Sequence, residues 1–158
     1  MTDIVLDIKR KDVYNEVARI SGYVGAKSFK EQDGQMDAYT RIAVTDSDSE
    51  MLDRFWEDCC GKVAGELQRL INDIVSVDGG DVAFVAKLPY FKGEKEIARK
   101  QIVQKDLFSC FVNFILCKWF ELTDKERCEY YLANYNDFIK GVRRKLCMKH
   151  APTKAEYE

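Results

Sequence analysis

The sequence contains a single histidine, His150, and its six cysteines include no pair with the Cys-x-x-Cys spacing. Structural zinc sites are usually built from such cysteine pairs, or from cysteines together with histidines, so the sequence offers little material for one. It also has no glycine-rich phosphate loop, and no cysteine lies in a context that would activate it as a nucleophile. We therefore expect no metal, no cofactor and no catalytic residue, and we predict that the protein is not an enzyme.

An excess of charge of one sign is absent as well. The chain of 158 residues has 25 Lys and Arg against 27 Asp and Glu, for a formal net charge of -2. So balanced a chain has no overall field that would attract nucleic acid or an anionic membrane. Its longest apolar stretch, 102–122, is interrupted by Ser109, Asn113 and Lys118, which makes it too polar to cross a bilayer. We expect a soluble protein with no membrane partner.

The length and the cysteines fit one domain made in a reducing compartment. A chain of 158 residues can bury its own core without disulfide bonds or metals. Most of the cysteines fall on apolar positions of the predicted helices, where a free thiol packs like a small hydrophobic group. They are Cys59, Cys60, Cys110, Cys117, Cys128 and Cys147. The domain is expected to cover residues 1–150, and Pro152 with its charged neighbours predicts a flexible tail at 151–158.

The N-terminal part of the chain predicts one short strand and one helix. Residues 1–8 alternate loosely between apolar and polar side chains, which is typical of an edge strand or an extended arm. From about Lys11 to Phe29 apolar residues recur at helical spacing, although two glycines weaken the second half. Residues 31–38 read as a loop, and 39–44 as a short extended piece.

A capping box predicts the next helix. In the segment from Ser47 to Glu50 the serine hydroxyl can accept from the backbone of the glutamate, whose side chain can return to the serine N–H. A broad apolar stripe then continues to about Val75, where we expect the helix to end in a turn at 78–81. Residues 82–88 are β-rich and are followed by Pro89, so they predict one strand or hairpin arm.

The C-terminal half predicts a pair of antiparallel helices. Residues from about Glu94 to Leu122 are apolar on most sides, as in the central helix of a bundle or a helix covered by another subunit. Thr123 to Glu126 begins a new helix whose apolar positions keep a spacing of three or four as far as Leu146. Because the connection is so short, the two helices must pack as neighbours. The fold class is therefore mainly α, a bundle of about four helices with a small β insertion or hairpin.

Two stretches of the chain resemble small structural proteins of tailed bacteriophages. The segment from Thr40 to Glu50, followed by a long amphipathic helix, resembles the opening of such proteins. The segments 114–120, 129–135 and 142–146 are similar to the closing helices of head-to-tail connector, or adaptor, proteins. The resemblance implies a helical domain made in the bacterial cytoplasm and built into the virion neck as a homo-oligomeric ring. The ring would lie between the portal protein and the tail or neck proteins, with the genome passing through its channel.

Two sets of residues are candidates for contacts with partners. Large aromatic residues commonly anchor interfaces, so the ring interface is expected at Phe55, Trp56, Trp119, Phe120 and Tyr131. A basic segment without acidic residues is a candidate for contact with phosphate, including passing DNA, or with a protein partner. It comprises Lys140, Arg143, Arg144, Lys145 and Lys149. The same charges can instead complement the helix C-terminus, and the alternative function is a small cytosolic DNA-binding or regulatory helical protein.

Overall fold

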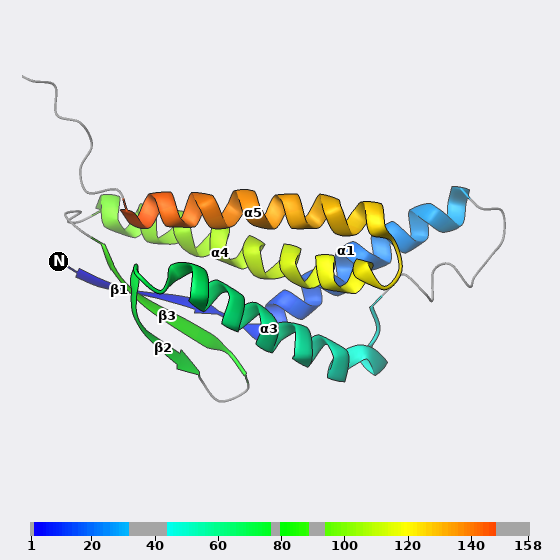
Figure 1. Cartoon of the computed structure of the whole chain (residues 1–158), viewed down its shortest axis with the longest axis horizontal. Coiled ribbons are helices and arrows are strands. Elements are labelled where there is room, and N and C mark those ends of the chain that lie inside the picture. Colours follow the sequence, from blue (N-terminus) through cyan, green and yellow to red (C-terminus); the bar gives the residue numbers. More distant parts are fainter. Residues whose placement is uncertain (1, 32–43, 77–79, 89–93, 148–158) are drawn as a thin grey trace, which may run out of the picture.

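The computed structural model describes residues 2–31, 44–76, 80–88 and 94–147. In these ranges the chain forms four α-helices, one short 3-10 turn and three β-strands (Figure 1). The elements are β1 (Thr2–Ile8), α1 (Arg10–Glu31), the turn η1 (Asp46–Asp48), α3 (Ser49–Leu67), β2 (Ile71–Ser76), β3 (Val82–Leu88), α4 (Glu94–Glu121) and α5 (Lys125–Cys147). The predicted fold class, mainly α with a small β element, is confirmed.

The three strands form one antiparallel sheet in the order β1-β3-β2. Phe84 of the central strand β3 is paired with Leu6 on one side and with Ile74 on the other. Residues directly opposite each other in such a ladder point to the same face of the sheet. Leu6 and Phe84 are fully buried against the helices, whereas Ile74 is exposed. The helices therefore cover this face over β1 and β3, and over β2 they cover Ile71 in part but leave Ile74 open.

Helix α4 is the centre of the molecule. It is apolar on most sides because α5, α1, α3 and the strand β1 all contact it. Trp56 of α3 and Phe84 of β3 both pack against Phe111 of α4, with ring centroids 4.9 and 6.2 Å apart from it. Helix α5 runs back antiparallel along α4 (Figure 1), so the helix pair predicted from the short connection is confirmed. Its apolar side chains Tyr135, Ile139, Val142 and Leu146 close this part of the core.

The second predicted helix begins where expected, at Ser49, but it ends earlier and is capped by other residues than predicted. It was expected to continue to Val75, but α3 ends at Leu67 and Ile71–Ser76 is the strand β2. Pairing with β3 outweighs the helical spacing of this segment, which is rich in β-branched residues. At the start, Thr45 takes the capping role with Asp48, whose carboxylate accepts from the Thr45 N–H at 2.8 Å. The capping box is therefore formed by Thr45 and Asp48, two residues before the predicted capping residues Ser47 and Glu50.

The other predicted segments fall partly outside the described residues. Residues 1–8 were expected to form an edge strand or an arm, and β1 is an edge strand of the sheet. Helix α1 confirms the helix expected at about 11–29, and β3 confirms the strand at 82–88. The predicted loop after residue 31, the extended piece at 39–43, the first half of the turn at 78–81 and the tail at 151–158 lie outside the described ranges. Within those ranges, every helix is either too short or too polar to cross a membrane.

Candidate functional site

The aromatic residues expected at a ring interface lie mostly in the core of the subunit. Trp56, Trp119 and Phe120 are buried, and Phe55 and Tyr131 are half-buried. The Tyr14 and Trp56 rings pack edge to face with centroids 6.1 Å apart, and Phe120 stacks on Tyr131 with centroids 5.5 Å apart. Trp56, Trp119 and Phe120 therefore stabilise the subunit itself and are not available as surface anchors. Of the set, Phe55 and Tyr131 keep part of their surface free.

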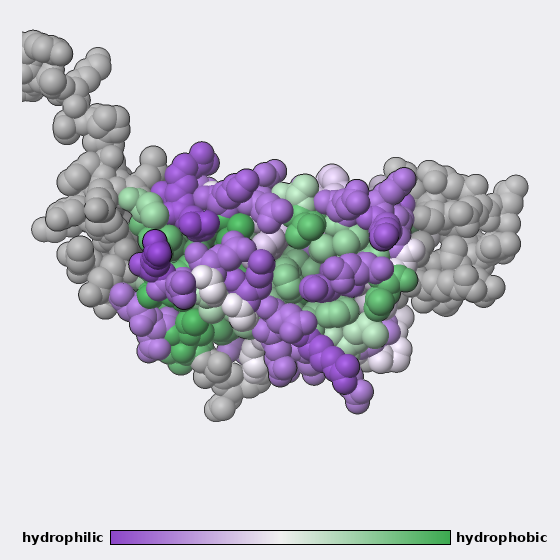
Figure 2. Space-filling model, viewed as in Figure 1, coloured by the Kyte–Doolittle hydropathy of each residue, from purple (hydrophilic) through white to green (hydrophobic). Residues whose placement is uncertain are grey.

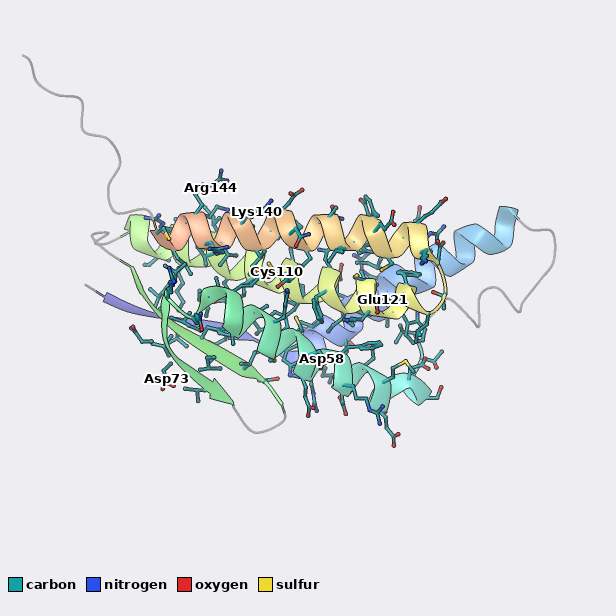
Figure 3. All side chains as sticks on the ribbon, in the orientation of Figure 1. Asp58, Asp73, Cys110, Glu121, Lys140 and Arg144 are labelled. Carbon is teal, nitrogen blue, oxygen red and sulfur yellow. The ribbon has the colours of Figure 1, made fainter. Side chains whose placement is uncertain are left out.

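The basic residues of α5 divide into exposed and paired side chains. Lys140, Arg143 and Arg144 are exposed, and Figure 3 shows Lys140 and Arg144 pointing away from the helix pair. Lys145 is instead engaged in an ion pair with Asp106 of α4. Lys149 lies outside the described residues. The predicted contact set thus contains three side chains that a partner can reach without breaking an existing ion pair with another helix.

A cleft of about 510 Å³ lies beside Arg143, where the end of α3 approaches the end of α5. It is lined by Gly65, Glu66, Gln68, Arg69, Leu70, Arg143 and Cys147. The fold brings Arg69 towards the basic side chains of α5, although the two arginines are 74 positions apart in the sequence. Two arginines at one cleft enlarge the surface that a phosphate or a carboxylate could contact.

A second cleft of about 590 Å³ lies between the start of α1 and α4. Its lining residues are Asp7, Lys9, Asp12, Gln101, Gln104, Lys105 and Phe108. They carry charges of both signs and two amides, but they include no thiol, hydroxyl or imidazole that could serve as a nucleophile. The lining is typical of a hydrated surface groove.

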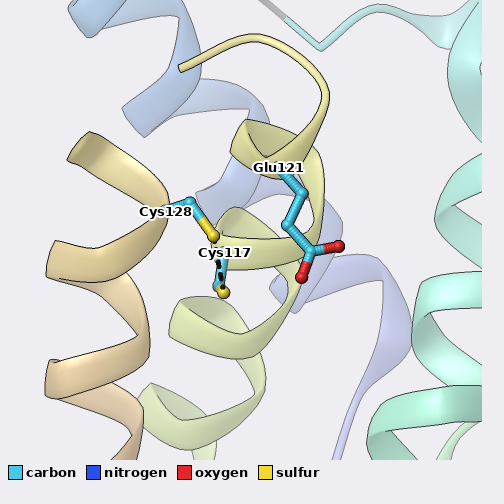
Figure 4. A group of neighbouring side chains, drawn as sticks. All are labelled: Cys117, Glu121 and Cys128. Carbon is cyan, nitrogen blue, oxygen red and sulfur yellow. Dashed lines mark hydrogen bonds between the residues drawn. The ribbon is translucent and has the colours of Figure 1, made fainter. Parts of the chain in front are cut away.

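A group of two thiols and one carboxylate lies at the turn between α4 and α5 (Figure 4). Cys117 and Glu121 are one helical turn apart on α4, and Cys128 faces them from the first turn of α5. The two Sγ atoms share a hydrogen bond at 3.3 Å, and the Glu121 carboxylate completes a set of ligand atoms that all lie within 4.8 Å of one another. Burial and the contact with Cys128 raise the pKa of Cys117 to about 12.

This group was missed by the sequence analysis, which considered only cysteine pairs close together in the sequence. Cys117 and Cys128 are eleven positions apart and lie on different helices, so no short motif contains both. The signal was available in the predicted helix pair, because both residues are about one turn from the connection and antiparallel packing places such positions opposite each other. Which sides of the two helices face each other could not be derived from the connection alone.

The six cysteines are free thiols, as predicted. Cys59, Cys110 and Cys117 are buried, Cys60 and Cys128 are half-buried, and Cys147 is exposed. Burial raises the pKa of Cys60 to about 11, and the pKa of Cys59 is raised well above its ordinary value for the same reason. Most of these thiols thus pack as small apolar groups that remain protonated at neutral pH.

Comparison of this chain with protein families, with curated proteins and with solved structures gives no match.

Proposed function

We propose that this chain is a structural subunit of the neck of a tailed bacteriophage, where identical copies form a ring between the portal protein and the tail. The resemblance of its opening and closing helices to connector proteins is one support. The mainly α fold with a small sheet is another, since it is the kind of fold that this resemblance implies. The observation that carries the proposal is the presence of two separate apolar groups on the subunit surface.

The first apolar group lies at the tip of the helix pair. It consists of Leu122 in the connection and Tyr130 in the second turn of α5, which are 68% and 62% exposed. The second group lies on the edge strand β2 and consists of Ile74 and Val75, which are 41% and 43% exposed and flank this edge on opposite faces of the sheet. Figure 2 shows hydrophobic residues at the surface near the turn of the helix pair and over the sheet, among many hydrophilic side chains. We call Leu122 and Tyr130 the tip group, and Ile74 and Val75 the edge group.

Two different apolar surfaces on one subunit fit the geometry of a ring. Copies that join head to tail use two unlike patches, and the chain of contacts closes when the rotation between neighbours allows it. The edge group is suited to one side of such a contact, since β2 lies at the end of the sheet and none of the described strands pairs with its outer side. In the proposed ring, the tip group of one copy packs against the edge group of the next.

Paired variants test this arrangement directly. Leu122→Asp disables the tip group and Val75→Lys disables the edge group, while Thr123→Asp and Asn72→Lys introduce the same charges at exposed positions close by. We expect rings of the unmodified chain, alone or with the portal protein of the same phage, in light scattering and negative-stain microscopy. Each of the first two variants should be monomeric, and the controls should still form rings.

Mixing the two disabled variants separates a ring from a symmetric dimer. A mixture of Leu122→Asp and Val75→Lys retains one intact head-to-tail contact per pair and should give heterodimers that grow no further. If the unmodified chain stays monomeric both alone and with the portal protein, the proposal is wrong. It is also wrong if both disabled variants still assemble into rings.

The alternative, a small DNA-binding or regulatory protein, is favoured by one observation. Lys140, Arg143 and Arg144 are exposed on α5, and Arg69 lies at the same end of the molecule. A regulator would bind duplex DNA as a monomer or dimer, with an affinity that falls steeply as salt is added. Such binding by a chain that forms no rings would favour this function over the connector.

A further inference from the structure

We infer that Cys117, Glu121 and Cys128 form a binding site for a thiophilic divalent metal ion, with Zn²⁺ as the expected occupant. The inference does not depend on the proposed ring, because it concerns one helix pair within a single chain. Its basis is the convergence of three ligand atoms from two helices at one point of the surface (Figure 4).

The geometry is close to the one that zinc requires. Zinc binds cysteine sulfur at about 2.3 Å and carboxylate oxygen at about 2.0–2.2 Å in a tetrahedral arrangement, so two bound sulfur atoms lie about 3.8 Å apart. The two Sγ atoms here are 3.3 Å apart, and all three ligand atoms lie within 4.8 Å of one another. Side-chain rotations that move these atoms by less than about 1.5 Å are enough to bring them to bonding distance.

The positions of the ligands on the helices favour a preformed site. Residues four apart on an α-helix lie on the same face, and Cys117 and Glu121 have this spacing. Cys128 is held opposite them because the connection between α4 and α5 contains only residues 122–124. The backbone of the helix pair therefore holds the three ligands on one side of its tip.

The surroundings allow an ion to enter and tolerate its charge. Cys117 is buried but Cys128 is half-buried and Glu121 is exposed, so the site opens to solvent on the carboxylate side. Two thiolates and one carboxylate around Zn²⁺ carry a net charge of -1. Lys118, whose Nζ atom lies 3.8 Å from the Glu121 carboxylate, partly offsets it. The ammonium group can stay close to the bound carboxylate because the existing contact is long and partly exposed.

The donor set selects the class of metal. Thiolates favour zinc and other thiophilic ions over Mg²⁺ and Ca²⁺, which prefer oxygen ligands. The chain supplies three ligands, so a water molecule takes the fourth position in the isolated protein. The ion would link the last turn of α4 to the first turn of α5 and would stabilise the helix pair at its tip.

Titration of the reduced protein with Co²⁺ and Zn²⁺ tests the inference. Co²⁺ bound tetrahedrally by thiolates gives an intense charge-transfer band in the near ultraviolet and visible bands typical of four-coordination. We expect one Co²⁺ per chain with these bands, and their loss when Zn²⁺ is added. Zn²⁺ at a hundredfold excess over its Kd should raise the melting temperature by about 5 °C or more.

Four variants assign the ligands. Cys117→Ser and Cys128→Ser should lose the charge-transfer band and the thermal stabilisation. Glu121→Gln should keep the band and lower the affinity at least tenfold, and it should fold normally because Glu121 is exposed. Cys147→Ser, at an exposed cysteine outside the group, should behave like the unmodified chain. Circular dichroism of each variant monitors the fold.

Two results would overturn the inference. One is the absence of a thiolate charge-transfer band in the reduced, folded chain at millimolar Co²⁺. The other is a band of unchanged intensity in both Cys117→Ser and Cys128→Ser, which would locate the metal elsewhere. Glu121→Gln is expected to fold normally, so an unchanged metal affinity in that variant would show that the Glu121 carboxylate is not a ligand.

Discussion

The hydroxyl of Tyr14 donates a 2.6 Å hydrogen bond to Oδ1 of Asp53 and so joins the second turn of α1 to the second turn of α3. The guanidinium of Arg10 lies over the Tyr14 ring, 5.8 Å from its centroid, and is 3.6 Å from the same carboxylate oxygen. The two helices are thus connected by a small polar network at the edge of the aromatic core. The network therefore helps to fix the orientation of α1 relative to α3.

Removing the Tyr14 hydroxyl should weaken the fold measurably. Tyr14→Phe keeps the ring against Trp56 but leaves Asp53 without its neutral donor, and we expect a loss of about 1–2 kcal/mol in the free energy of unfolding. Urea unfolding at neutral pH measures it. Tyr23→Phe is the matched control, since Tyr23 lies on the same helix but is largely exposed and should change stability by less than about 0.5 kcal/mol. Equal losses in the two variants would contradict the role given to the hydrogen bond.

The fold should lose stability as the pH rises above 9. Burial raises the pKa of Cys60 to about 11 and that of Cys117 to about 12, from an ordinary value of 9.0. The unfolded chain therefore releases these protons first, and the free energy of unfolding falls with pH between about 9 and 12. Urea unfolding at a series of pH values should show a nearly constant stability from pH 7 to 8.5 and a decline beyond it.

Single cysteine variants should change the slope of that decline. Cys60→Ala removes one of the thiols with a raised pKa, so the variant should lose stability less steeply above pH 9 than the unmodified chain. Cys147→Ser serves as the control at an exposed position. A slope in Cys60→Ala identical to that of the unmodified chain would show that the Cys60 thiol does not contribute to the alkaline loss.

The sequence predicted those parts of the fold in which local pattern and packing agree. The helix pair α4 and α5 followed from sustained helical spacing and a short connection, and both conditions hold in the folded chain. The strand β2 was missed because Ile71 and Ile74 also fit the apolar stripe of the preceding helix, and only pairing with β3 decides between the two. The sequence pattern also identified three aromatic residues as apolar positions of helices, namely Trp56, Trp119 and Phe120. It could not show whether the chain itself or a neighbouring subunit covers them.

A pair of glycine substitutions should have opposite effects on stability. Gly80 has a φ of +87°, and a Cβ atom there would lie 2.5 Å from Nη1 of Arg10. Gly80→Ala is expected to cost about 1–2 kcal/mol from the backbone alone, because a side chain disfavours this conformation. Gly61→Ala, inside α3 and with open space around the added atom, should stabilise the chain by about 0.5–1 kcal/mol. Thermal unfolding of the two variants side by side measures both, and a loss of stability in Gly61→Ala would contradict the helix assigned there.

Tyr135 gives the last prediction, because its hydroxyl is buried without a hydrogen-bond partner among the described residues. The ring itself is fully buried and packs against Phe114, with centroids 5.5 Å apart. A buried polar atom that makes no hydrogen bond lowers stability, so its removal restores the lost desolvation energy. Tyr135→Phe should therefore leave the free energy of unfolding unchanged or raise it by about 1 kcal/mol, in contrast to the loss expected for Tyr14→Phe. A loss of more than about 1 kcal/mol in urea unfolding would mean that the hydroxyl has a partner, such as a buried water molecule, that contributes to the stability of the core.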